Sequence, residues 1–166
     1  MSARPFQLSP RHRWIVYSVF AVLFLSGFAW WFADEAQEES STPVAWAEAA
    51  KPVLIRVHGA AAFVFLVVLG TVLAVHAQRA WKAEVNHRSG LMLGGWFGVQ
   101  AVTGYGLLYL AVAQVRDWTG TVHVTLGLLA PVMLTVHVVR GRILVRRRIP
   151  GVTRSGPEEK VARTSN

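Results

Sequence analysis

The sequence predicts an all-α fold, an integral membrane four-helix bundle in one domain. Of its 166 residues, 53% are hydrophobic and only 16% are charged. The apolar residues form long continuous blocks rather than an amphipathic pattern. Each block reaches the roughly 20 residues needed to cross a hydrocarbon core about 30 Å thick. The expected helices span about 14–33, 53–77, 91–114 and 118–139.

The first block, 14–33, follows a basic segment, as the apolar part of a signal peptide would. It is longer than such a region, however, and ends in Trp30, Trp31 and Phe32 without a small-residue cleavage site. We therefore expect this block to be retained as the first membrane helix.

Basic residues predict the orientation of the remaining helices. They gather before 14–33, between 53–77 and 91–114, and after 139, and basic loops favour the cytoplasmic side. Both termini are then cytoplasmic, and 53–77 and 118–139 both run from outside to inside. The net charge of +8 lies mostly beside membrane ends, which predicts contact with anionic lipid and argues against nucleic acid as a partner. A membrane domain 1–148 is followed by 149–166, which we expect to be a disordered cytoplasmic tail.

Histidines are the residues that point to chemistry, because polar groups inside a membrane are costly. The chain has no cysteine, which excludes thiolate metal sites, iron–sulfur ligation and thioether-attached haem. Four of the six histidines fall within apolar blocks: His58, His76, His123 and His137. His58 and His123 lie at matched depth near the outer ends of their helices, and His76 and His137 lie near the inner ends.

Helical spacing predicts that each helix presents its two histidines on one face. The 18 residues from His58 to His76 make five turns, and the 14 from His123 to His137 make about four turns with a lag of roughly 40°. Facing pairs at two depths are typical of bis-histidine haem, here two haem b about 21 Å apart along 118–139. The helix 53–77 would rise about 27 Å over the same interval, some 6 Å too far.

Small and basic residues accompany the outer pair. Gly59, with three alanines after it, follows His58, and Gly127 lies one turn after His123, which leaves room for a flat macrocycle. Such residues also line ordinary helix contacts in membranes. Arg56 and Arg116 lie near the outer surface, where they could pair with haem propionates or serve as interfacial anchors.

Several motifs carry a resemblance to a known family. They are Leu25-Ser26-Gly27 in the first helix, His58 in the second, Thr103-Gly104 in the third, and His123, Gly127 and His137 in the fourth. By these motifs the chain resembles the four-helix dihaem cytochrome b subunits of bacterial membrane oxidoreductases, such as formate dehydrogenase gamma subunits, nickel–iron hydrogenase cytochrome b subunits and small stand-alone b-type cytochromes. The resemblance implies that His58 and His123 hold the outer haem and that His137 is one ligand of the inner haem.

The other ligand of the inner haem stays open. The family commonly takes it from a histidine directly before the first tryptophan, where this chain has Arg13, with His12 one residue earlier. Helix geometry favours His76 as the partner of His137, the family pattern favours His12, and an empty inner site is a third alternative.

The resemblance also implies a function. The chain would pass electrons between a periplasmic redox protein or dehydrogenase subunit and the quinone pool, as a multi-pass electron-transfer subunit in the bacterial inner membrane rather than as a self-sufficient enzyme. Candidate quinone contacts are Arg79, His87 and Arg88. The alternatives are a stand-alone quinol oxidoreductase acting on a small diffusible acceptor, and a haem-free transport or scaffold protein.

Overall fold

The computed structural model describes residues 9–82 and 86–147, and this part of the chain is entirely helical apart from short connections. Four helical stretches within it are long and apolar enough to cross a membrane. The expected multi-pass, all-α membrane architecture is therefore confirmed, whereas the tail 149–166 lies outside the described residues. The elements are α1 (Pro10–Glu38), α2 (Ala45–Val72), the π-helical η1 (Leu73–Ala77), α3 (Gln78–Lys82), α4 (His87–Tyr109) and α5 (Ala113–Arg147).

The helix bounds differ from the apolar blocks for two physical reasons. Helices α1 and α5 and the continuous helical stretch Ala45–Lys82 extend beyond their blocks, because a helix continues past the hydrocarbon slab into polar residues. Helix α4 instead ends five residues early, at Tyr109, and α5 begins at Ala113. The backbone turns extended at Leu110 (φ −73°, ψ 117°). This turn escaped prediction because residues 110–112 are all apolar and read as membrane helix.

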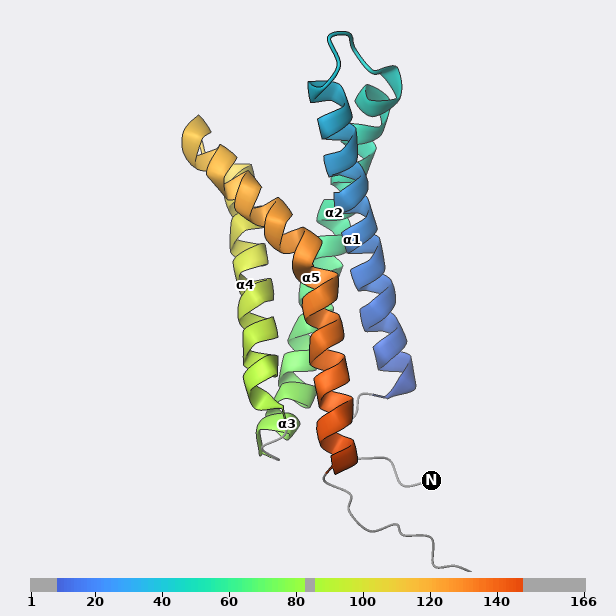
Figure 1. Cartoon of the computed structure of the whole chain (residues 1–166), viewed down its shortest axis with the longest axis vertical. Coiled ribbons are helices and arrows are strands. Elements are labelled where there is room, and N and C mark those ends of the chain that lie inside the picture. Colours follow the sequence, from blue (N-terminus) through green and yellow to red (C-terminus); the bar gives the residue numbers. More distant parts are fainter. Residues whose placement is uncertain (1–8, 83–85, 148–166) are drawn as a thin grey trace, which may run out of the picture.

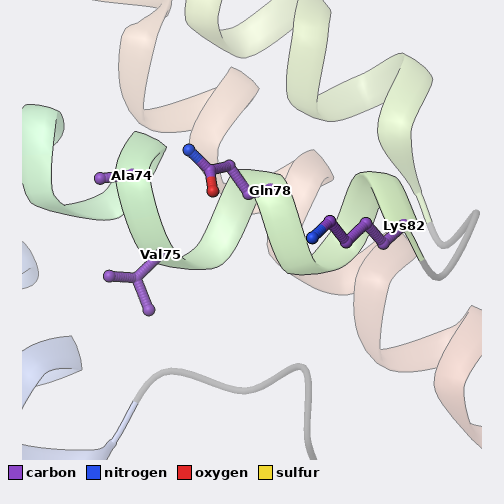
Figure 2. A pocket seen from close by; sticks show the side chains of 4 residues that line it. All are labelled: Ala74, Val75, Gln78 and Lys82. Carbon is purple, nitrogen blue, oxygen red and sulfur yellow. The ribbon is translucent and has the colours of Figure 1, made fainter.

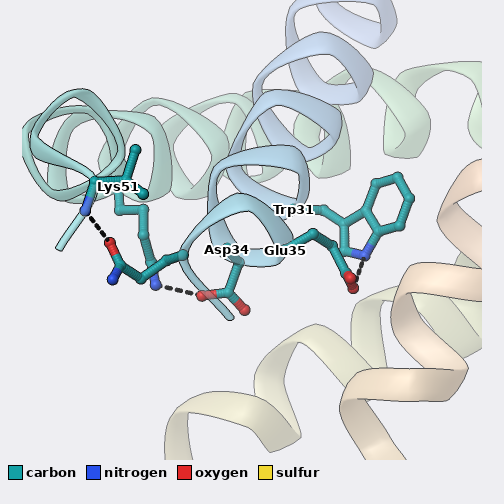
Figure 3. Close-up of polar contacts among 6 residues, drawn as sticks. Trp31, Asp34, Glu35 and Lys51 are labelled. Carbon is teal, nitrogen blue, oxygen red and sulfur yellow. Dashed lines mark hydrogen bonds and ion pairs between the residues drawn. The ribbon is translucent and has the colours of Figure 1, made fainter. Parts of the chain in front are cut away.

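The helices pack as two antiparallel pairs, α1 along α2 and α4 along α5, with a further contact between α1 and α5 (Figure 1). Polar contacts fasten the α1–α2 hairpin at its connection (Figure 3). Lys51 forms an ion pair with Asp34 across the two helices, and the Trp31 indole N–H donates to Glu35 at 3.0 Å within α1. The end of α1 and the start of α2 are therefore held together outside the apolar layer.

The best-packed region is an aromatic waist, formed by Phe20, Phe65 and Phe97 together with Ala130. The rings of Phe65 and Phe97 are 5.0 Å apart, and Phe20 lies 6.0 Å from Phe65 and 6.1 Å from Phe97. These residues come from α1, α2, α4 and α5, so all four long helices meet there. Most other large apolar side chains face outward, as expected for helices surrounded by lipid.

Helix α5 is bent along its length (Figure 1). Pro131 lies inside the helix, and proline has no N–H to donate to the carbonyl four residues earlier, here that of Gly127. A proline of this kind is the usual cause of a helix kink. The bend separates the part of α5 that carries His123 from the part that carries His137.

We expect Phe97→Ala to lower the free energy of unfolding by about 3 kcal/mol, because truncating a buried aromatic side chain leaves a cavity. Phe97 is 7% exposed, whereas Leu108 on the same helix is 77% exposed and serves as the control. Reversible unfolding in mixed detergent micelles would measure both variants. Equal destabilisation by Phe97→Ala and Leu108→Ala would contradict the waist as the packed centre of the bundle.

Candidate functional site

Two histidines from different helices meet at what we call the first level. His58 on α2 and His123 on α5 are both half-buried, and their ring centres lie 6.3 Å apart with planes 88° to one another. The two residues are 65 positions apart in the sequence. The structure thus brings together the outer pair that the sequence predicts.

The ring of His58 is held by α1. Its Nδ1–H donates to the carbonyl oxygen of Leu23 at 3.0 Å, and the hydroxyl of Ser26 lies 3.4 Å from the same nitrogen. Gly27 makes this approach possible, because a Cβ at that position would come within 2.7 Å of His58 Cε1. The imidazole is therefore anchored through Nδ1 against the backbone of α1.

The ring of His123 is held in the same way by α4. Its Nδ1 lies 3.0 Å from the hydroxyl oxygen of Thr103. A Cβ on the next residue, Gly104, would stand 3.1 Å from His123 Cε1. Both first-level rings are therefore anchored at Nδ1 by hydrogen-bond partners on helices other than their own.

What we call the second level contains His137 on α5 and His76 in η1. The Nδ1 of His137 lies 3.0 Å from the hydroxyl of Ser89, beside Gly90, on α4. Asn86, at the N-cap of α4, donates from its side-chain amide to the backbone carbonyl of His137 at 3.2 Å. His76 is half-buried and interacts electrostatically with His137.

The π turn of η1 changes the geometry that led the sequence to favour His76. Five full turns between His58 and His76 require uninterrupted α-helix, but residues 73–77 form i→i+5 rather than i→i+4 hydrogen bonds. One π turn takes up one extra residue, which rotates the residues after it by about 100° and shortens the rise by about 1.5 Å. His58 and His76 nevertheless both lie toward α5, since His58 meets His123 and His76 interacts with His137. The extra residue makes the height mismatch between the two helices smaller.

The other predicted site residues make contacts other than with the paired histidines. The Nε2 of His12 is 3.2 Å from the hydroxyl of Thr71. Arg56 is exposed, and Gly127 faces the side-chain amide of Gln100 on α4, 3.1 Å from a would-be Cβ. Among the proposed quinone contacts, His87 packs on Trp81 with ring centres 5.5 Å apart.

The two remaining quinone candidates add little to the site. Arg88 is exposed at the start of α4, and the side chain of Arg79 lies outside the part of the chain that the structure describes. A recess nearby on η1 and α3 is lined by Ala74, Val75, Gln78 and Lys82 (Figure 2). It lies along the helical stretch that carries His76, and Gln78 and Lys82 supply its polar groups.

The first-level spacing can be compared with that of two imidazoles on one iron. A nitrogen–metal bond is about 2.0 Å, and a five-membered ring with C–N bonds of about 1.33 Å has its centre about 1.1 Å from each nitrogen. Two such ligands on opposite sides of one metal would have ring centres about 6.2 Å apart. The observed 6.3 Å is close to this value, so the spacing of the pair fits two imidazoles on one iron.

Pairs of histidines suit a porphyrin better than a bare ion. Within residues 9–82 and 86–147, no group of three or more His, Asp or Glu side chains is placed to hold a metal ion. A protein site for a free ion such as zinc needs three or four protein ligands. In haem, the macrocycle supplies four nitrogens and the protein needs to supply only the axial positions.

Ser89, Gly90 and Asn86 are site residues that the sequence did not reveal. Their role depends on α4 lying beside the lower part of α5, which spacing along one helix cannot show. One signal was present: Ser26-Gly27, Ser89-Gly90 and Thr103-Gly104 are three of the four Ser-Gly or Thr-Gly dipeptides in the long helices. The fourth, Thr119-Gly120, faces Leu107 and supports no histidine.

We expect Gly27→Ala to destabilise the chain by about 1 to 3 kcal/mol, the usual cost of overpacking. The added Cβ would stand 2.7 Å from the His58 ring and displace it. Gly98→Ala is the control, since a Cβ there meets nothing within 4 Å. Thermal unfolding in detergent would measure both, and a Gly27→Ala protein as stable as Gly98→Ala would contradict the close packing of His58 on α1.

The two levels are described from the structure of this chain alone. Comparison of the chain with protein-family models, with curated proteins and with solved structures gives no match.

Proposed function

We propose that the chain is a membrane b-type cytochrome in which His58 and His123 are the axial ligands of one haem b. The observation that carries the proposal is the 6.3 Å between their ring centres, which is close to the separation that two imidazoles have on one iron. Anchoring of both rings through Nδ1 supports it as well, because metal-ligating histidines are ordinarily oriented through their other ring nitrogen.

A second haem b is proposed at the second level, with His137 as one ligand. His76 is the better supported partner, because it lies near enough to His137 for positive charges on the two rings to repel each other. The Nε2 of His12 is instead within hydrogen-bond distance of Thr71. Helix spacing favours the same choice, because His76 would share the face of the helix that carries His58.

Electron transfer is the activity that this ligation supports. Haem supplies a one-electron couple, and imidazoles on both faces leave no open position for a substrate. The chain's own residues hold the rings at two depths and pack the intervening layer, in which Phe65, Phe97 and Ala130 are buried. His123 and His137 lie 14 residues apart on one helix, which places the two levels about 21 Å apart along α5.

The chain would exchange electrons with a partner at each side of the membrane. We place the second level at the cytoplasmic side of a bacterial inner membrane, because Arg140 and Arg142 follow His137 on α5. Electrons would pass between a quinone near the second level and a periplasmic redox protein or dehydrogenase subunit near the first. The recess beside His76 supports the quinone end, since Gln78 and Lys82 bring hydrogen-bond donors to it.

A reduced-minus-oxidised spectrum of the purified chain, with a measured haem-to-chain ratio, tests the proposal. We expect a b-type spectrum and a ratio near two for the unaltered protein. His58→Ala and His123→Ala should each remove the same single haem, and His137→Ala the other. His87→Ala is the control, because that ring packs on Trp81 rather than against another histidine. A colourless protein after expression with ample haem would favour the haem-free transport or scaffold alternative.

The same measurement distinguishes the two candidate ligands of the inner haem. We expect His76→Ala to lower the ratio from two to one and His12→Ala to leave it unchanged. Loss of haem in His12→Ala with retention in His76→Ala would assign the inner site to His12 and His137.

A further inference from the structure

Three of the candidate ligands share one kind of support. Each ring lies against a glycine of a neighbouring helix, and the hydroxyl residue directly before that glycine approaches the ring's Nδ1. The glycine leaves room for the ring, and the hydroxyl supplies a polar partner. The sets are His58 with Ser26-Gly27, His123 with Thr103-Gly104, and His137 with Ser89-Gly90.

Hydrogen-bond directions at the second level assign the proton of His137. The Asn86 amide nitrogen donates to the His137 carbonyl, which directs the amide oxygen toward Ser89. That oxygen lies 2.6 Å from Ser89 Oγ and can only accept, so the single hydroxyl proton of Ser89 is used there. Ser89 Oγ must then accept from His137 across their 3.0 Å contact. The proton of His137 is on Nδ1, and its Nε2 carries a lone pair.

Hydrogen-bond directions at the first level assign the protons of His123 and His58 in the same way. The Thr103 hydroxyl donates to the carbonyls of Val99 at 2.9 Å and Gln100 at 3.1 Å on its own helix. Its oxygen is then left to accept from His123 Nδ1–H at 3.0 Å. The proton of His58 is also on Nδ1, because its 3.0 Å partner there is the carbonyl oxygen of Leu23.

We infer that Thr103 and Ser89 are positioning residues, which hold His123 and His137 as Nδ1–H tautomers with the Nε2 lone pair available to iron. The tautomer assignment stands without haem, whereas the effect on iron rests on the proposed function. An acceptor at Nδ1–H raises the basicity of the ligating nitrogen, which favours ferric over ferrous iron. Each hydroxyl therefore lowers the midpoint potential of its own haem.

The first test reads the tautomer without haem. The full chain is labelled with ¹⁵N-histidine, expressed under haem depletion and placed in lipid nanodiscs, where nitrogen chemical shifts identify the protonated ring nitrogen. We expect Nδ1–H at His123 and His137. Thr103→Ala should release His123 alone, and Ser89→Ala should release His137 alone, toward the Nε2–H form. Nε2–H at both histidines in the unaltered chain would overturn the inference.

The second test uses the haem-loaded chain and a redox titration of both haems. Ser89→Ala should shift only the second-level potential to more positive values and weaken haem retention there about 10- to 100-fold, the usual cost of losing an outer-shell partner. Thr103→Ala should do the same only at the first level. The conservative variants Ser89→Thr and Thr103→Ser should restore both potentials.

Matched controls come from other α5 hydroxyls that donate to their own helix. Thr121 bonds the carbonyl of Asp117 at 3.1 Å, and Thr135 bonds that of Pro131 at 2.7 Å. We expect Thr121→Ala and Thr135→Ala to leave both potentials unchanged. A pigmented protein whose two midpoint potentials are unchanged by Ser89→Ala and Thr103→Ala would overturn the inference, while the cytochrome proposal stands. A colourless protein with Nδ1–H histidines would do the reverse.

Discussion

The arrangement of this bundle depends on giving each polar histidine ring a hydrogen-bond partner inside a hydrocarbon layer that holds no water. An imidazole N–H inside a hydrocarbon layer must find an acceptor within the protein, since an unsatisfied group there costs several kcal/mol. Each anchored histidine meets this need through Nδ1 on a neighbouring helix, by way of a carbonyl or a hydroxyl. The helices are therefore positioned by their histidines as much as by their apolar faces.

The two hairpins contribute unequally to the two levels. Helix α5 supplies one histidine to each level, and α4 anchors both of them through Thr103 and Ser89. The α1–α2 side supplies the opposing histidines, with His58 anchored on α1. The α4–α5 pair thus presents two anchored histidines at two depths, and the continuous helical stretch from α2 to α3 carries His58 and His76 on the other side.

Much of the fold and the first level could be predicted from the sequence, because both depend on the number of residues between features of the same chain. Hydropathy locates a helix wherever about 20 apolar residues occur together, and matched depth follows from distance to the helix end, as for His58 and His123. Two features cannot be predicted from residue spacing. The break at Leu110 is made of apolar residues, and the π turn at 73–77 has no distinguishing composition. Contacts between helices cannot be predicted from spacing either, since the role of Ser89 depends on which face of α4 meets α5.

The aromatic waist has a consequence for ions. Rings from three helices close on Ala130 midway between His123 and His137, so the centre of the bundle is a plug of hydrocarbon rather than a chain of polar groups. A proton or metal ion crossing this layer would have to shed its hydration without replacement ligands. An electron needs no such coordination and can tunnel through packed side chains. Under the proposed function, this layer would let electrons pass between the two levels while excluding ions.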